Sequence, residues 1–121
     1  MIATFDSSVW IEYFAGSEKG KSLKDIVDST EIIYTPAICL LEIKAKYMKE
    51  KHEYRSRIEF ICSRSDIIDV DSEVALKGAE MKIEHELYTV DALVYAAARY
   101  KNSILFTADH HFERLDKVEL I

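Results

Sequence analysis

Short apolar runs alternate with longer stretches of helical periodicity along the chain. Residues 2–5, 32–34, 66–70 and 103–106 have the length and the β-branched content of short buried strands, and 118–121 adds a terminal one. Between these runs, apolar residues recur at spacings of three and four, which predicts helices. Strands that are apolar on both faces and alternate with helices are typical of a covered parallel sheet. The pattern predicts an α/β fold, a three-layer α/β/α sandwich around a parallel sheet of four to five strands.

The expected helices have recognisable ends. They cover about residues 9–15, 18–27, 36–51, 52–62, 73–86 and 90–99, with a short helical turn around Phe112. Gly16 ends the first helix, and Pro36 suits the first position of the third. Side chains expected to cap the helix N-termini are Ser7, Ser8, Thr35, Asp71, Ser72 and Thr89.

Composition indicates one ordinary globular domain over residues 1–121. Apolar residues make up 49% and charged residues 31% of the 121, with three Gly and one Pro, so long flexible linkers are not expected. The first residues lack the basic segment of a signal peptide, and no apolar run approaches the length of a membrane span. We therefore expect a soluble, cytoplasmic protein without a membrane partner. Cys39 and Cys62 lack metal-type spacing, and Cys39 is expected to be a buried small hydrophobe.

Three acidic residues lie where a parallel sheet binds ligands. Asp6 directly follows the strand at 2–5, Asp109 lies just beyond the end of the strand at 103–106, and Asp91 lies in the first turn of the helix that leads into the second of these strands. Ligands of open α/β sheets gather at the carboxyl ends of the strands. Each acid alone also has a structural explanation, as a helix cap or as a partner of a helix dipole.

Glu42 lies in an almost wholly apolar part of its expected helix. At 100° per residue, Ile38, Leu41, Ala45 and Met48 share its stripe, so the carboxylate is expected to face inward. A buried carboxylate costs several kcal/mol unless it is paired or bound to a metal. Since this helix follows the second strand, Glu42 can reach the same edge of the sheet as the other three acids.

Four carboxylates at one edge of a sheet predict a divalent cation. Held together without one, they would repel one another strongly. Ligands that are all oxygen favour Mg²⁺, with Mn²⁺ as a substitute, over zinc. A hard metal held by a few carboxylates, with positions left for water and phosphate, is the arrangement used to hydrolyse phosphodiesters.

Four segments resemble, in order, the four motifs of the PIN-domain family, and of its VapC-like toxin branch in particular. They are DSSVWIEYF at 6–14, TPAICLLEI at 35–43, TVDALVYAAA at 89–98 and LFTAD at 105–109. Each motif alone is weak, but together they span nearly the whole chain, each on its expected element. The resemblance implies a compact α/β/α sandwich, in agreement with the element order.

The resemblance also implies site residues, an activity and partners. It assigns Asp6, Glu42, Asp91 and Asp109 to a catalytic metal site. Ser8 and Thr107 are assigned to orienting carboxylates or waters, although capping explains these two equally well. Family members typically cut RNA and leave a 5′-phosphate and a 3′-hydroxyl. Toxin members usually form homodimers and are silenced by a small antitoxin protein.

Two features leave alternatives open. His110 and His111 follow Asp109 and either reach the metal or scissile phosphate or are ordinary exposed loop residues. The net charge of −6 disfavours nucleic acid, but residues 44–57 concentrate positive charge. This segment is either a solvated helix face or an RNA or partner surface. Its four candidate contact residues are Lys44, Lys46, Lys49 and Arg55.

Other classes of protein fit the sequence less well. A HAD-type phosphatase needs a second Asp where Ser8 stands, a receiver domain needs an acidic pair at the first strand, and neither explains Glu42. A PIN nuclease that processes RNA without an antitoxin stays open, as does a non-catalytic PIN-like binding module. In the binding module, aromatic and apolar side chains would form a groove or a dimer face: Tyr13, Phe14, Tyr47, Met48 and Tyr54. Trp10 and Phe14 are expected to be mainly core.

Overall fold

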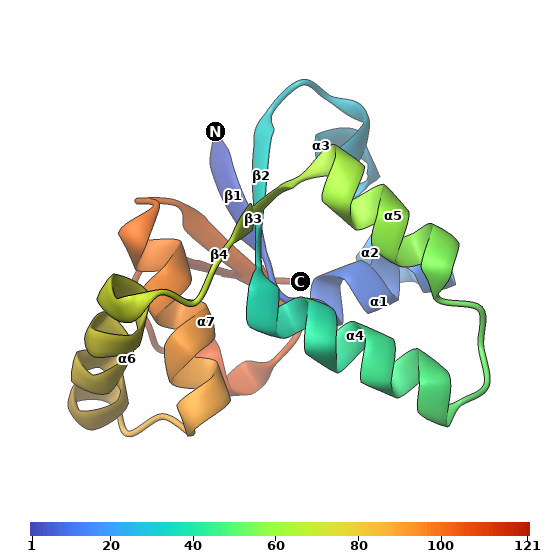
Figure 1. The fold of residues 1–121 in the computed structure, drawn as a ribbon. Coiled ribbons are helices and arrows are strands. Elements are labelled where there is room, and N and C mark those ends of the chain that lie inside the picture. The colour runs from blue at the N-terminus through green and yellow to red at the C-terminus, as the bar shows by residue number, and fades with distance from the viewer.

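A computed structural model describes residues 1–121 and contains one five-stranded parallel sheet (Figure 1). The strand order is β3-β2-β1-β4-β5, so β1 lies at the centre. The strands are β1 (Ile2–Phe5), β2 (Ile32–Pro36), β3 (Asp66–Ile68), β4 (Ile104–Thr107) and β5 (Val118–Leu120). Every neighbouring pair of strands is parallel. The predicted fold class and number of strands are confirmed.

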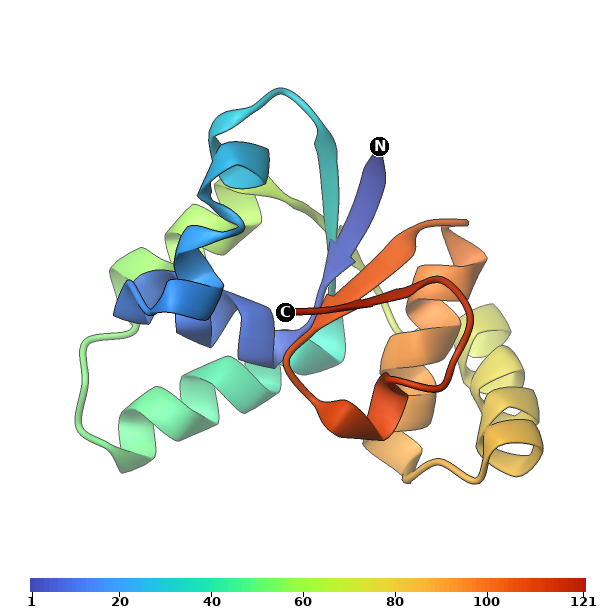
Figure 2. The ribbon, with the colours of Figure 1, turned by 180° about the vertical axis from the view of Figure 1, so that it is seen from behind.

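Helices cover both faces of the sheet, as Figures 1 and 2 show from opposite sides. The helices are α1 (Ser7–Ala15), α2 (Glu18–Lys21), α3 (Lys24–Asp28), α4 (Ala37–Lys49), α5 (Arg55–Arg64), α6 (Ser72–His85) and α7 (Thr89–Tyr100), with a 3-10 turn η1 (His110–Phe112). The first three and α5 lie on one face, α7 covers the other, and α6 packs against α7. No helix combines the length and the apolar composition that a bilayer crossing requires.

The core has a part on each side of the sheet. On one side, Phe5 of β1 and Trp10 of α1 are fully buried, with their ring centroids 5.1 Å apart. On the other side, the alanine-rich face of α7 lies close to the sheet, and Leu105 and Phe112 pack there. Small side chains on α7 let its backbone approach the strands, so a short chain still has a densely packed interior.

The register of the central strands places the start of α1 beside the end of β4. Phe5 of β1 pairs with Phe106 of β4, and the Asp6 amide donates to the Phe106 carbonyl at 3.3 Å. The chain moves from β1 to β2 and β3 on one side and then crosses back to β4 on the other. Reversal of the strand order opens a crevice at the carboxyl ends of the strands. Asp6, directly after β1, and Thr107, the last residue of β4, lie at this edge of the sheet.

The structure corrects several expected helix starts. Asp6, not Ser7 or Ser8, caps α1, because its side chain accepts from the Val9 amide. Thr35 belongs to β2 and is fully buried. Its hydroxyl is used instead by the Trp10 indole, which donates to Thr35 Oγ1 at 3.0 Å. A threonine before a helix is therefore not necessarily a cap when a buried donor competes for it.

Three further boundaries differ from expectation. Pro36 is the N-cap of α4 and not its first helical residue. Thr89 is itself helical, and Tyr88 precedes it without a capping side chain. The helix expected over 18–27 is two short helices, since the chain turns at Ser22 to bury Leu23. The cap predicted at Asp71 is confirmed, because its carboxylate accepts from the Val74 amide at 2.9 Å.

Candidate metal centre

The four acids of the sequence motifs come from four elements that meet at the carboxyl edge of the sheet. Asp6 follows β1, Glu42 lies in the second turn of α4, Asp91 lies in the first turn of α7, and Asp109 follows β4 by two residues. The four carboxylates are close enough to repel one another. The charge of Glu42 raises the pKa of Asp6, and the charges of Asp91 and Asp109 raise the pKa of Glu42. The sheet topology thus gathers residues from positions 6 to 109 at one edge of the sheet.

Asp6 is the most deeply buried of the four, with 5% of its surface exposed. Its Oδ1 accepts from the Ser8 hydroxyl at 2.6 Å and from the Val9 amide at 3.1 Å. Its Oδ2 accepts from the Thr107 hydroxyl. Burial raises the pKa of Asp6 to about 6, although these three donors and the helix start favour the charged form. Loss of hydration therefore raises the pKa of Asp6 by more than the three hydrogen bonds lower it.

Ser8 and Thr107 connect the first acid to the loop that carries the last one. The Ser8 hydroxyl accepts from the Ala108 amide at 2.9 Å while it donates to Asp6. The Thr107 hydroxyl accepts from the Asp109 amide at 2.9 Å while it donates to Asp6. Each hydroxyl is thus used as both donor and acceptor. The two side chains hold the Asp6 carboxylate and the backbone before Asp109 in a defined relation.

Glu42 reaches the crevice for a different reason from the one its stripe predicts. Leu41 is 62% and Met48 55% exposed, so that side of α4 faces outward. The buried face of α4 carries Cys39, Ile43 and Tyr47 instead. Glu42 lies at the boundary between the two faces and is partly buried, and the Ser7 hydroxyl donates to its Oε1 at 3.1 Å. The position of α4 beside α1, and not an inward apolar stripe, directs this carboxylate to the site.

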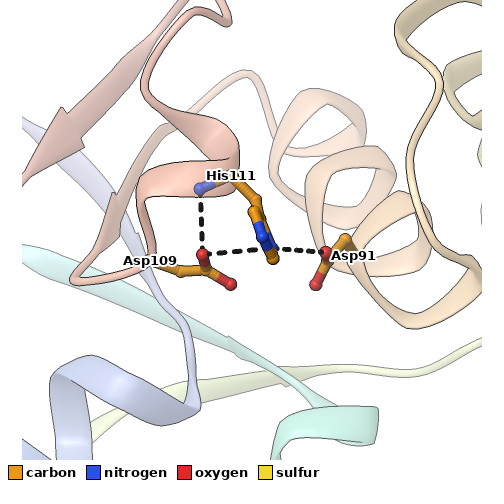
Figure 3. A group of neighbouring side chains, drawn as sticks. All are labelled: Asp91, Asp109 and His111. Carbon is orange, nitrogen blue, oxygen red and sulfur yellow. Dashed lines mark hydrogen bonds and ion pairs between the residues drawn. The ribbon is translucent and has the colours of Figure 1, made fainter.

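Asp91, Asp109 and His111 form the tightest group of ligand atoms at this edge (Figure 3). One ligand atom from each of the three lies within 4.8 Å of the others. The His111 ring stands between the two carboxylates, which come from α7 and from the loop after β4. Asp6 and Glu42 are not part of this close group. Sequence reasoning left the role of His111 open, because its direction depends on the 3-10 turn η1.

Three acids of the site, Asp6, Glu42 and Asp91, have pKa values above those of free carboxyl groups. Burial is the main cause for Glu42 and also for Asp91, and repulsion from Asp109 adds to both. The nearby His111 ring partly offsets the rise in the pKa of Asp91. A cation at this point would reverse the balance, because it would favour the ionised carboxylates. The donor set thus fits a hard divalent metal.

Two neighbouring features help to define the site. The Cys39 thiol is fully buried, and burial, together with the charges of Asp6 and Glu42, raises its pKa well above the usual range. It is therefore a neutral small hydrophobe, as predicted.

A cleft of about 500 Å³ adjoins the site, with Asp91 and His111 on its wall and Tyr88 and Arg114 beside them. This cleft is open to solvent and large enough to receive part of a polymeric substrate.

The basic segment is on the surface, as expected of either interpretation. Lys44, Lys46, Lys49 and Arg55 are all exposed along α4 and at the start of α5. Lys46 pairs with Glu50 at 2.8 Å, and the Lys44 ammonium lies 5.2 Å from the centre of the Tyr54 ring. Of the aromatic residues considered for a docking groove, Tyr47 is buried in the core and is not available.

Comparison with solved structures supports the fold. A toxin–antitoxin complex from Klebsiella pneumoniae contains a chain that matches with a TM-score of 0.81 and 23% identity, over 97% of this chain and 95% of that one. VapBC2 from Rickettsia felis, bound to a promoter DNA fragment, matches with a TM-score of 0.77 and 21% identity, over 100% of this chain and 98% of that one. VapC20 from Mycobacterium tuberculosis, a toxin that cleaves the sarcin–ricin loop, matches with a TM-score of 0.75 and 19% identity, over 98% of each chain.

Sequence comparison identifies the family. No curated protein matches the chain. The profile of the PIN domain matches residues 3–118, which include all four acids, all the helices and the strands apart from Ile2 of β1 and the last two residues of β5. The chain therefore belongs to the PIN domain family.

Proposed function

We propose that this protein is a metal-dependent endoribonuclease and the toxin component of a VapBC-type toxin–antitoxin pair. The observation that carries the proposal is the convergence of Asp6, Glu42, Asp91 and Asp109 from four elements at one solvent-accessible edge. Burial, with a smaller contribution from repulsion, raises the pKa of three of these groups above the ordinary value. Groups held at such a cost cluster at functional sites more often than elsewhere.

The four acids have different parts in the proposed reaction. Asp91 and Asp109 lie closest together and would hold Mg²⁺ or Mn²⁺, with Asp6 and Glu42 completing the acidic site. A bound divalent ion would supply Lewis-acid stabilisation of charge on the phosphate and would lower the pKa of a nearby water. Ser8 and Thr107 hold the Asp6 carboxylate in one orientation, and Ser7 does the same for Glu42.

The reaction proposed is hydrolysis of an RNA phosphodiester. The oxygen of a water molecule bonds to phosphorus, and the bond from phosphorus to the 3′ oxygen breaks. The water loses one proton to a site carboxylate, and the departing 3′ oxygen gains one. The products carry a 5′-phosphate and a 3′-hydroxyl. The cleft beside Asp91 and His111 provides room for the nucleotides on either side of the scissile bond.

Cleavage of a mixed single-stranded RNA pool tests the proposal. We expect cleavage with Mn²⁺ or Mg²⁺, none with EDTA, and a loss of about 100-fold or more in Asp6→Asn, because that acid contacts both hydroxyls of the site. Asp25→Asn is the matched control, since Asp25 is exposed on α3 and should leave activity unchanged. Cleavage that persists in EDTA would contradict the metal-dependent mechanism. A folded, metal-bound and inactive protein would favour the non-catalytic binding module.

The toxin assignment adds two partners, a cognate antitoxin and a second copy of the chain. Its support is the overall likeness to chains from toxin–antitoxin complexes together with a shallow apolar pocket of about 310 Å³. Tyr13, Phe14 and Phe60 line this pocket on α1 and α5, beside Arg57. Aromatic side chains next to an arginine are typical of protein interfaces.

Light scattering on purified protein tests both partners. We expect the mass of two chains for the protein alone. Where a small protein is encoded beside the gene, co-expression with it should give a stable complex that no longer cleaves RNA. Phe60→Ala should weaken the complex about tenfold or more, whereas Leu76→Ala, on the exposed side of α6, should not. Equal effects of the two substitutions would exclude the apolar pocket as the docking site.

A further inference from the structure

The His111 ring occupies the position between two carboxylates where a cation would be expected (Figure 3). Its Nδ1 lies 3.3 Å from Asp109 Oδ1 and 3.8 Å from Asp91 Oδ2. These separations are close to those between neighbouring ligand atoms of one metal ion, which lie about 3 Å apart when each is about 2.1 Å from the metal. A small adjustment of the ring would let all three atoms contact one ion.

The backbone and a neighbouring ring restrict His111 from two sides. Its amide donates to Asp109 Oδ1 at 2.9 Å, so the carboxylate that faces the ring also anchors the main chain of η1. The Tyr88 ring lies against the imidazole edge-on, with the centroids 6.0 Å apart. Although the His111 side chain is 64% exposed, its direction is therefore set by contacts with the site.

His110 has the same side chain but no such position. Its Nδ1 faces Glu113 Oε2 at 3.1 Å, within η1 and the residue after it. The His110 side chain is 70% exposed and forms no ion pair with the acids of the site. The two adjacent histidines thus provide a natural comparison between one that pairs with the acids of the site and one that pairs with Glu113 instead.

We propose that His111 Nδ1 is a direct ligand of the metal held by Asp91 and Asp109, and that this nitrogen makes the site prefer Mn²⁺ to Mg²⁺. Mg²⁺ is bound almost entirely by oxygen, whereas Mn²⁺ begins the first-row series of divalent metals whose affinity for sites that include nitrogen rises toward Cu²⁺. The four acids alone point to Mg²⁺, and the nitrogen changes that preference. This inference rests on the metal site of the proposed function but not on its RNA substrate.

Metal binding to three proteins tests the proposal without any RNA. Metal-free wild type, His111→Gln and His110→Gln are titrated with Mn²⁺ and, in competition, with Mg²⁺. We expect the ratio of the Mg²⁺ to the Mn²⁺ dissociation constant to fall about tenfold or more in His111→Gln, because the glutamine offers oxygen in place of nitrogen. His110→Gln should keep the wild-type ratio.

Pulsed electron paramagnetic resonance of the Mn²⁺-bound proteins provides a direct second readout. We expect a coupling from directly bound ¹⁴N in wild type and in His110→Gln, and its loss in His111→Gln. Mn²⁺ bound to wild type without this coupling would overturn the role of His111 and leave the carboxylate metal site intact. An unchanged affinity ratio in His111→Gln would do the same. Absence of any metal binding by folded wild type would overturn the metal site itself, and metal-dependent RNA cleavage reports on that site separately.

Discussion

Asp6 is a carboxylate in a place from which most of the water has been removed. It caps α1, accepts two hydroxyl donors and faces the charge of Glu42. The rise of its pKa from 3.8 to about 6 corresponds to about 3 kcal/mol of free energy stored against the ionised form. A bound cation would offset this penalty, so the metal-free protein is expected to be the less stable form.

This penalty predicts how stability depends on pH. The pKa of Asp6 is about 6 in the folded state and about 3.9 in the unfolded chain, so the folded state binds more protons between these values. The contribution of Asp6 to the unfolding free energy therefore falls as pH rises from about 4 to about 6. Asp6→Asn should stabilise the protein in EDTA by up to about 3 kcal/mol near pH 7.5, and by nothing near pH 4.

Urea denaturation in EDTA at the two pH values provides the measurement. Asp25→Asn serves as the control for removal of one exposed negative charge and should show no comparable gain. Addition of Mn²⁺ should stabilise wild type more than Asp6→Asn. If Asp6→Asn proved less stable than wild type near pH 7.5, its role as a helix cap would outweigh the cost of its charge.

The sequence located the acids well but not the contacts that orient them. Asp6 and Asp109 were recognisable because each follows an apolar strand, and this position depends only on local sequence. Glu42 was placed at the site with an incorrect reason, since Leu41 and Met48 on its stripe are exposed. Which face of an amphipathic helix is buried depends on its neighbours in space, and α4 contacts α1 and α7 on the side of Cys39 and Ile43.

At the scale of elements, the short helix α2 holds the end of α1 in place. Ser17 caps α2 by accepting from the Gly20 amide at 3.1 Å, and Gly20 is buried against α1. A Cβ at Gly20 would lie 2.1 Å from the Glu12 carbonyl oxygen. The absence of a side chain therefore lets the two helices pack in direct backbone contact. Because Asp6 caps α1 and Ser7 and Ser8 are its first residues, this contact also supports the acidic site.

Two glycine substitutions test this packing. Gly20→Ala should destabilise the protein by about 3 kcal/mol or more, because backbone atoms of α1 cannot move aside as a flexible side chain can. Gly16→Ala should cost about 1 kcal/mol, since Gly16 has a φ of 66° but open space around it. Urea denaturation of both variants gives the comparison. Equal stability of the two would show that α2 can shift away from α1 without penalty.

Element boundaries were less predictable than element types. All five strands and the helical regions were identified from the pattern of apolar residues, because burial of a strand or of a helix face requires apolar residues at characteristic spacings. The prediction that Thr35 caps a helix was wrong, because its hydroxyl forms hydrogen bonds with the Trp10 indole and the Ser65 hydroxyl within the core. Such competition involves residues 25 and 30 positions away, so no local pattern reveals it.

At the scale of the molecule, the parallel sheet was predictable but the order of its strands was not. Alternation of strands and helices implies parallel pairing, whereas the central place of β1 depends on contacts between distant segments. The positions of Asp6, Glu42, Asp91 and Asp109 along the chain predicted that they meet at one edge of the sheet, and the resemblance to the PIN-domain family assigned them to a catalytic metal site. The contrast between His110 and His111 required the geometry of η1.

The hydrogen bond from Thr107 to Asp6 joins residues 101 positions apart and has a consequence for synthesis of the protein. A ribosome makes Asp6 at the beginning, but β4 can pair with β1 only after residues 104–107 have left the exit tunnel. Until then the Asp6 carboxylate lacks its Thr107 partner, and Asp109 is still inside the tunnel. A nascent chain therefore cannot assemble the acidic site. If the protein is the ribonuclease proposed above, it would be inert toward its own messenger throughout most of its translation.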